Sequence, residues 1–226
     1  MPAELMVWYR NRARHRLSLD LTTDGYTYFQ KRNEGENRFV RLAETYVFNN
    51  KTWTVVQKRY DGSQSFNRDW NEYKNGFGDP YGEYWIGLEA MHQLIARSPH
   101  ALLIILESWA GVMKHALYDQ FYLASKTDHY RLNVSGYSGT AGNCLEEMGH
   151  NYMAFSTKDK DNDLAAGSCA NSFKSGYWYS QCSSCNINGP MKPDTGRQDR
   201  YAVIWFTFSN KFMPLRKIKM LISRMP

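Results

Sequence analysis

One segment of the chain, from about residue 136 to about residue 200, shows no regular hydrophobic periodicity. Gly, Ser, Asn and Asp are frequent there, and the segment holds all four cysteines of the sequence, Cys144, Cys169, Cys182 and Cys185. A loop of this length inside a compact domain is usually functional or cross-linked, and binding residues tend to collect on such loops. We therefore expect regular elements on both sides to support one long, loop-rich subdomain.

The segments that flank this subdomain predict an α+β fold with a mainly antiparallel sheet. Runs of β-branched and aromatic residues, or alternation of apolar and polar residues, are typical of strands. Such runs predict strands at 53–60, 101–109, 117–123, 130–134, 201–208 and 215–222.

Two short helices are expected between the first two of these strands. Phe66, Trp70 and Tyr73 fall on one helical face, with Asn67 as the expected N-cap. The apolar spacing within 88–95 predicts the second helix.

Length and composition indicate one globular unit. The chain has 226 residues, of which 42% are hydrophobic and 15% aromatic, enough to bury a sizeable core. It contains no run of about 18 apolar residues, so we expect a soluble chain without a membrane span. Since no repeat or linker divides it, we expect an N-terminal extension over 1–23 and a single domain over 24–226, beginning at the turn signal Asp24-Gly25.

The charge balance is mildly basic, with 28 Lys and Arg against 22 Asp and Glu, a net charge of +6. Part of the excess lies near the two ends of the chain, within 10–16 and 216–224. An anionic partner such as nucleic acid or a polyanionic glycan would explain this excess, but solvated termini explain it more simply. No nucleic-acid motif accompanies these charges, so we expect no nucleic-acid partner.

Acidic residues alternate in the sequence DKDND at 159–163. Carboxylates at this spacing can reach one hard cation, and an irregular backbone can add the carbonyl oxygens that calcium accepts. The EF-hand pattern fails, because its required Gly and its bidentate Glu would fall on Leu164 and Ala170. Two interpretations stay open, a calcium site completed by carbonyls and water, and a solvated acidic turn.

The cysteines also allow several arrangements. Cys169 and Cys182 bracket a short loop, and a disulfide there would stabilise the fold by about 3 kcal/mol. The alternatives are a four-cysteine zinc site in an intracellular protein and a redox-active Cys182–Cys185 pair, but a second C-x-x-C and a βαβ pattern are missing.

N-glycosylation sequons at Asn50 and Asn133 fit an extracellular protein. The N-terminus, however, lacks the apolar core of a secretory signal.

Sequence templates for enzymes are not matched. The histidines form no H-E-x-x-H, and neither G-x-S-x-G nor a P-loop occurs. Glu146, Glu147 and His150 could form an acid–base set, but a solvated polar loop explains them better. From the residues alone we expect a calcium-assisted binding module and no enzyme.

Several blocks of sequence, in order and with their spacing, resemble the fibrinogen C-terminal globular domain. They are WTVVQKR at 53–59, GFG at 76–78, EYWIG at 83–87, YRL at 130–132, GYSGTAG at 136–142, FSTKDKDND at 155–163, GYWY at 176–179 and NING at 186–189. The resemblance extends from about residue 24 to the C-terminus and implies a secreted domain of the fibrinogen-related class, which includes ficolins, tachylectins and angiopoietins.

The resemblance implies a calcium site and a ligand pocket beside it. Calcium would be held by the side chains of Asp161 and Asp163 and by the carbonyls of Ala165 and Gly167. The family's second disulfide corresponds to Cys169–Cys182, and a cis peptide would join Gln181 to Cys182. The residues expected to line the pocket are Phe173, Gln181, Cys182, Ser183, Tyr201 and Ala202, with the amides of Cys182 and Ser183 facing a ligand carbonyl.

The sequence departs from the family pattern at several of these places. Ser183 stands where acetyl-binding members usually carry His, and Cys185 stands where Ser is usual. Both cysteines of the family's N-terminal disulfide are missing, and Glu44 takes the second position. Cys144 and Cys185 could therefore pair with each other, link two chains or stay free.

These features lead to one expected function and one alternative. The first is a secreted, calcium-dependent lectin that recognises acetylated glycans or glycoproteins on microbial or host surfaces in innate immunity. The alternative is an angiopoietin-like domain that binds a protein receptor and no sugar. In either case the resemblance implies a homo-oligomer, assembled through regions that this chain does not contain.

Overall fold

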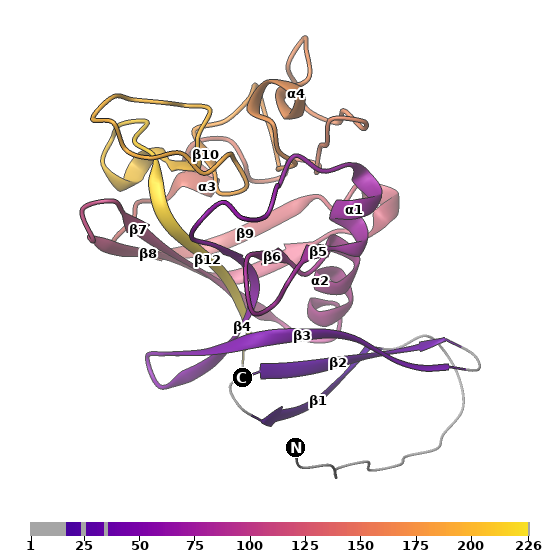
Figure 1. The fold of residues 1–226 in the computed structure, drawn as a ribbon. Helices are drawn as coiled ribbons and strands as arrows, with labels where there is room; N and C mark the ends of the chain where they lie inside the picture. Colours follow the sequence, from indigo (N-terminus) through magenta and orange to yellow (C-terminus); the bar gives the residue numbers. More distant parts are fainter. Residues whose placement is uncertain (1–16, 24–25, 34–35, 226) are drawn as a thin grey trace.

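The computed structural model describes residues 17–23, 26–33 and 36–225. Within these ranges one antiparallel sheet runs in the order β1-β2-β3-β4-β12-β7-β8-β9, with β6 paired to β4 and β5 paired to β6 (Figure 1). Its strands are β1 Leu17–Thr23, β2 Tyr26–Asn33, β3 Glu36–Phe48, β4 Lys51–Arg59, β5 Phe77–Gly78, β6 Tyr84–Trp85, β7 His100–Ser108, β8 Met113–Leu123, β9 Leu132–Gly139 and β12 Leu215–Arg224. A separate small sheet pairs β10 Cys185–Asn186 with β11 Ile204–Trp205.

The helices of the described residues are short. They are α1 Trp70–Asn75, α2 Leu88–Ile95, α3 Cys144–Glu147 and α4 Cys169–Phe173, with the 3-10 turns Lys126–Asp128 and Phe206–Phe208. None of them has the length and apolar character needed to cross a bilayer. The α+β class with a mainly antiparallel sheet is therefore confirmed.

The core is built around the central strands β4, β12 and β7. Six consecutive residues of β7, Ala101–Leu106, are buried. Side chains of a strand alternate between the two faces of the sheet, so an uninterrupted buried run means that both faces are covered. Figure 1 shows α1 and α2 beside the sheet, and α2 buries Leu88, Met91 and Ile95.

Local structure differs from the sequence expectation in two places. The N-cap of α1 is Asp69, which forms a capping box with Glu72, and not Asn67. The expected strand at 201–208 is reduced to the two residues of β11 followed by a 3-10 turn. Its apolar run reflects burial in the core, because residues 202–205 are all buried.

A buried carboxylate organises the turn that follows β4. The Glu83 side chain is fully buried and accepts hydrogen bonds from the backbone N–H groups of Tyr60, Asp61, Gly62 and Gln64, at 2.6 to 3.2 Å. The guanidinium of buried Arg59 lies 3.6 Å from it. One charged group thereby satisfies four backbone donors that have no strand partner.

An ion cluster links the N-terminal strand β3 to the central strands β4 and β12 of the sheet. Glu44 of β3 accepts hydrogen bonds from Lys58 of β4 at 2.7 Å and from Lys219 of β12 at 2.5 Å. Burial alone would raise the pKa of Glu44, but the two lysines outweigh it and lower the pKa. Glu44 stands at a position where the resemblance implies cysteine, so these ion pairs connect β3 to its neighbours where the family's disulfide is missing.

Of the expected N-terminal extension, residues 1–16 lie outside the described residues, as does the turn signal at Asp24-Gly25. Residues 17–23 form β1, which pairs with β2. At the other end of the molecule, the loop-rich subdomain lies above the sheet, far from β1–β3 (Figure 1).

Candidate functional site

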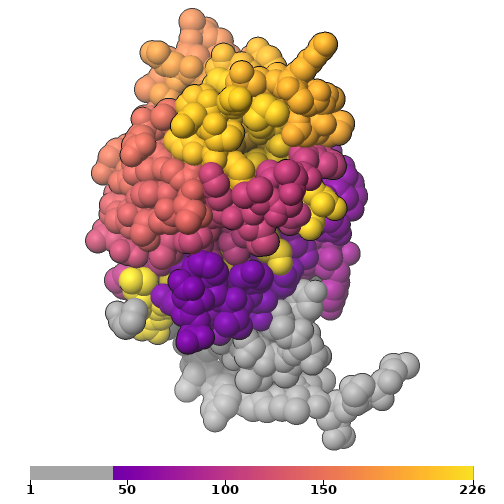
Figure 2. Space-filling view, turned by 90° about the vertical axis from the view of Figure 1, so that its left-hand side faces the viewer, coloured from indigo at the N-terminus to yellow at the C-terminus, as the bar shows by residue number. Residues whose placement is uncertain are grey.

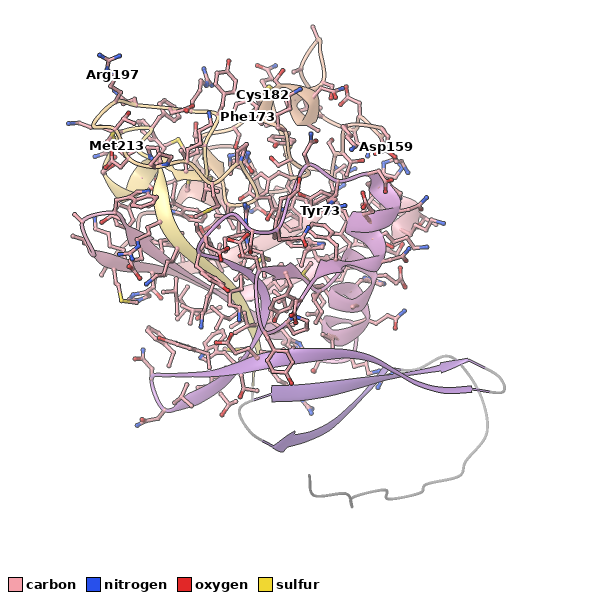
Figure 3. The ribbon with its side chains drawn as sticks, viewed as in Figure 1. Tyr73, Asp159, Phe173, Cys182, Arg197 and Met213 are labelled. Carbon is pink, nitrogen blue, oxygen red and sulfur yellow. A yellow bond between two sulfur atoms is a disulfide. The ribbon has the colours of Figure 1, made fainter. Side chains whose placement is uncertain are left out.

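The acidic loop is anchored to the rest of the fold by Asp159. Its carboxylate accepts the backbone N–H of Trp70 at 2.9 Å and the hydroxyl of Thr157 at 2.8 Å. Lys160 lies over the Trp70 ring, 4.1 Å from the centroid. Asp159 therefore fixes this loop at the start of α1, a role that the alternation of acidic residues does not reveal (Figure 3).

The two carboxylates expected to bind calcium lie together in this loop. Asp163 accepts the N–H groups of Ala165 and Cys169, both at 2.9 Å, and Asp161 accepts the N–H of Asp163 at 3.2 Å. Burial is the main cause that raises the pKa of Asp163, and the hydrogen bond and charge of Asp161 add to it. Two neighbouring carboxylates, of which Asp163 is partly desolvated and has a raised pKa, are a suitable place for a hard cation.

The backbone oxygens expected to complete this site are available. Among the residues that the structure describes, neither the carbonyl of Ala165 nor that of Gly167 accepts a hydrogen bond. Ala165 is half-buried and Gly167 is exposed. The donor set of Asp161, Asp163 and these two carbonyls contains only oxygen, as calcium requires, so the residues present fit this ion.

Two disulfides hold the turn 182–185. Cys182 pairs with Cys169 of α4, with Cα atoms 5.2 Å apart, as the resemblance implied. Cys185 pairs with Cys144 of α3, with Cα atoms 6.2 Å apart, which settles the alternatives left open for these two residues. Because all four thiols are joined in pairs, the zinc-site alternative is wrong.

The buried side chain of His150 forms hydrogen bonds with the same turn. Its side chain is fully buried, and Nδ1–H donates to the carbonyl of Trp178 at 2.9 Å. Nε2 accepts from the backbone N–H groups of Ser184 at 3.3 Å and Cys185 at 3.4 Å. Burial lowers the pKa of His150 to about 4, and the bond to Trp178 opposes this only in part. The interpretation of His150 as part of a solvated polar loop is therefore wrong.

The turn itself departs from the expected geometry. Among the described peptide bonds none is cis, so the expected cis link between Gln181 and Cys182 is wrong. The backbone reverses instead through a left-handed conformation at Cys182, with φ of 68°, and Ser180 N–H donates to the Cys182 carbonyl at 3.2 Å. Within the described residues, the amides of Cys182 and Ser183 have no hydrogen-bond acceptor.

The residues expected to line the pocket differ in exposure. Phe173 and Ala202 are buried, whereas Tyr201 is 48% exposed and Gln181 is exposed. The Tyr201 ring packs on Phe173 with centroids 5.1 Å apart. The Ser183 hydroxyl is buried and donates to the Cys185 carbonyl at 2.7 Å, so it is engaged within the turn.

A cation lies beside this aromatic pair. The Arg200 guanidinium carbon is 5.9 Å from the centroid of the Phe173 ring and 5.4 Å from that of Phe212. Figure 3 places Phe173 and Cys182 at the loop-rich end, with Arg197 and Met213 beside them on two separate loops. The site therefore combines an aromatic surface, a cation and two unpartnered amides, and two disulfides hold the turn that carries the amides.

Comparison with known proteins finds similar sequences in one family model and in several curated proteins. The family model described as "Fibrinogen beta and gamma chains, C-terminal globular domain" matches residues 48–225. Angiopoietin-related protein 6 of Mus musculus is 44% identical over 171 residues, which cover 75% of this chain and 37% of that protein. Angiopoietin-2 of Mus musculus is 39% identical over 171 residues, 75% of this chain and 34% of that protein. The chain thus spans about a third of the length of these curated relatives.

Solved structures show the same fold. The fibrinogen-like globe domain of human ANGPTL6 has a TM-score of 0.79 and 37% identity, and the match covers 89% of this chain and 90% of that one. Lamprey fibrin D-dimer, solved with the peptide ligand Gly-His-Arg-Pro-amide, has a TM-score of 0.76 and 32% identity, covering 88% of this chain and 68% of that one.

These relatives correct the expected function. They are angiopoietins and angiopoietin-related proteins, so the prediction of a calcium-dependent lectin for acetylated carbohydrates in innate immunity is wrong. They agree better with the alternative, an angiopoietin-like domain without sugar binding. The resemblance to the fibrinogen fold is confirmed, and the protein belongs to the family of C-terminal globular domains typified by the fibrinogen beta and gamma chains.

Proposed function

We propose that this protein is a non-catalytic binding domain whose loop-rich end recognises a protein receptor. The angiopoietin-related relatives support this choice, and the lamprey fibrin structure contains a bound peptide. The chain spans about a third of the length of the curated relatives. The activity and partners of a whole protein of this kind are therefore part of the same proposal.

The observation that carries the proposal is the surface around Tyr201. The unpartnered amides of Cys182 and Ser183 can donate to a carbonyl or carboxylate of a polypeptide. Tyr201 offers a half-exposed ring, and Arg200 offers a cation already oriented by two aromatic rings. Tyr and Arg are the residue types that dominate binding energy at protein interfaces. Since the disulfides and His150 already hold the turn 182–185 in one conformation, binding would cost little conformational entropy there.

We also propose that Asp161 and Asp163 hold a calcium ion that stiffens the loop next to this surface. A bound calcium ion supplies positive charge that offsets the repulsion between the two carboxylates. The ion would stabilise the acidic loop, which Asp159 ties to the start of α1 and which leads into α4, because Asp163 already accepts the N–H of Cys169 at the start of that helix. Its role here is structural.

Secretion and glycosylation form part of the same proposal. Two disulfides in a protein of this size favour an oxidising compartment. Asn50 and Asn133 are both exposed, so both sequons are accessible to glycosylation. Assembly into an oligomer through segments outside this chain would raise the avidity of a single weak site.

Binding to cultured animal cells tests the receptor proposal directly. The fluorescently labelled protein, made multivalent on streptavidin, is added to a panel of cell lines treated with trypsin, with glycosidases or with neither. We expect binding that trypsin abolishes, that glycosidases leave intact and that free N-acetylglucosamine does not compete. Binding that survives trypsin, or no binding to any cell line, would contradict a protein receptor.

Two variants locate the contact. Tyr201→Ala and Arg200→Ala should each reduce cell binding at least about tenfold, because central Tyr and Arg residues are worth about 2 kcal/mol at interfaces. Tyr122→Ala is the matched control, since Tyr122 is 51% exposed, lies on β8 and is not among the residues of the surface around Tyr201. Equal binding by all three variants would place the contact elsewhere.

A further inference from the structure

Apolar side chains gather at the turn between β7 and β8, which we call the hairpin tip (residues 109–113). Trp109 is 41% exposed, Val112 49% and Met113 59%. Single exposed apolar residues are ordinary, but three large ones within five consecutive residues are unusual. In Figure 1 this turn lies at the left-hand edge of the molecule, and Figure 2 views the molecule from that side.

The hairpin tip is held in one conformation by Ser108. The backbone N–H of Ser108 donates to the Val112 carbonyl at 2.9 Å, and its carbonyl accepts the N–H of Gly111 at 3.0 Å. The Ser108 hydroxyl accepts the N–H of Val112 at 3.1 Å. Gly111 adopts a φ of 79°, and a Cβ at this position would meet no atom within 4 Å. The tip is therefore a convex, preformed protrusion with its apolar side chains facing outward.

Three cations flank the tip, and we call Lys114, Arg216 and Lys217 the basic flank. The Arg216 guanidinium carbon lies 6.0 Å from the centroid of the Trp109 ring. Arg216 and Lys217 share one acid, Glu107, at 3.7 and 3.0 Å, and their side chains are 45% and 46% exposed. Lys114 donates to the carbonyl of Phe208 at 2.5 Å. Arg216 and Lys217 outnumber the one acid that they share, and Lys114 adds a third positive charge, so these residues give the surroundings of the tip a net positive charge.

We propose that the hairpin tip and the basic flank bind the surface of a bilayer that contains anionic phospholipids. Trp favours the boundary between headgroups and acyl chains, Val112 and Met113 would bury apolar surface there, and the cations would face the phosphates. A sulfated glycan would use the cations but would give Val112 and Met113 no role. A protein partner would need a groove shaped to receive the tip. This site is separate from the surface around Tyr201 and does not rest on the proposed receptor.

Vesicle sedimentation tests this proposal with lipid as the probe. The full-length protein is mixed with vesicles of phosphatidylcholine alone and with vesicles that also contain phosphatidylserine. We expect the wild type to sediment with the second kind and the tip variant Trp109→Ser/Met113→Ser to partition about tenfold more weakly. The flank variant Arg216→Gln/Lys217→Gln should lose the preference for phosphatidylserine. Tyr122→Ser, an exposed aromatic residue at the other end of β8, is the control and should bind as the wild type does.

A second measurement does not depend on how well the tip variant folds. Lipids brominated near the top of the acyl chains should quench part of the tryptophan fluorescence of the wild type, and Trp109→Phe should remove that quenching. The proposal is overturned if the wild type binds neither kind of vesicle, or if the quenching persists in Trp109→Phe. It is also overturned if soluble heparin binds the protein and the tip variant binds heparin and vesicles as the wild type does.

Discussion

His150 makes the turn 182–185 sensitive to acid. In the folded protein its Nε2 accepts hydrogen bonds from the backbone N–H groups of Ser184 and Cys185. A proton on Nε2 would turn this acceptor into a donor that faces two other donors, and both hydrogen bonds would be lost. Burial lowers the pKa of His150 from 6.5 to about 4. In the unfolded protein the same imidazole takes up a proton near its ordinary pKa. Between these two values the unfolded state binds more protons, so the free energy of unfolding falls as the pH falls from about 6.5 to about 4.

The loss in free energy of unfolding can be calculated from the change in the pKa of His150 between the unfolded and the folded protein. Each unit of pKa corresponds to about 1.4 kcal/mol, so the full change for His150 amounts to about 3 kcal/mol. Other groups of the protein also exchange protons as the pH falls, so a variant is needed to separate the contribution of His150. His150→Gln keeps an acceptor oriented toward Ser184 and Cys185 but removes the titrating group, so the other contributions stay common to both proteins.

Urea denaturation at pH 7 and pH 4, followed by tryptophan fluorescence with the disulfides intact, measures the difference. The wild type should lose about 3 kcal/mol more than His150→Gln between the two pH values. Equal losses in the two proteins would refute the reasoning, as would an NMR titration of the His150 ring near its ordinary pKa in the folded protein.

Three further outcomes are expected from other parts of the fold. Glu83→Ala should lower the free energy of unfolding by about 3 to 5 kcal/mol, because it leaves Arg59 without its buried partner; Glu147→Ala, at an exposed position, is the control and should change it little. Calcium should raise the melting temperature of the wild type, EDTA should reverse the rise, and Asp161→Asn should remove most of it; equal melting temperatures with and without calcium would exclude the ion. Replacing Cys144 and Cys185 together by Ser should cost about 4 kcal/mol by loss of the cross-link, measured by urea denaturation under oxidising conditions.

Some of the fold can be predicted from the sequence because its signals are local. The apolar run of β7 and the helical spacing within 88–95 depend only on neighbouring residues, and both elements lie at the expected positions. The resemblance supplies the Cys169–Cys182 pairing, because that pair belongs to a family pattern. In each case the information lies in a short stretch or in a known motif.

Other features depend on contacts between distant segments. His150 is buried because the turn 182–185 covers it, and nothing in its own neighbourhood of polar residues indicates this. Cys144 and Cys185 match no family pattern, so only the folded structure shows that they meet. The bond from Asp159 to Trp70 spans 89 positions in the sequence. The apolar run at 201–208 wrongly predicts a full strand, because burial in the core and pairing in a sheet leave the same pattern of residues.

The two disulfides are nested along the sequence, since the pair Cys169–Cys182 lies entirely within the interval closed by Cys144–Cys185. Their sequence separations are 13 and 41, so closing the inner ring costs about 1 kcal/mol less conformational entropy than closing the outer one. Once the inner ring exists it shortens the path that the outer pair must close. Oxidation during biosynthesis should therefore favour a fixed order, with the ring beside the acidic loop closing first and the bond to α3 completing the subdomain.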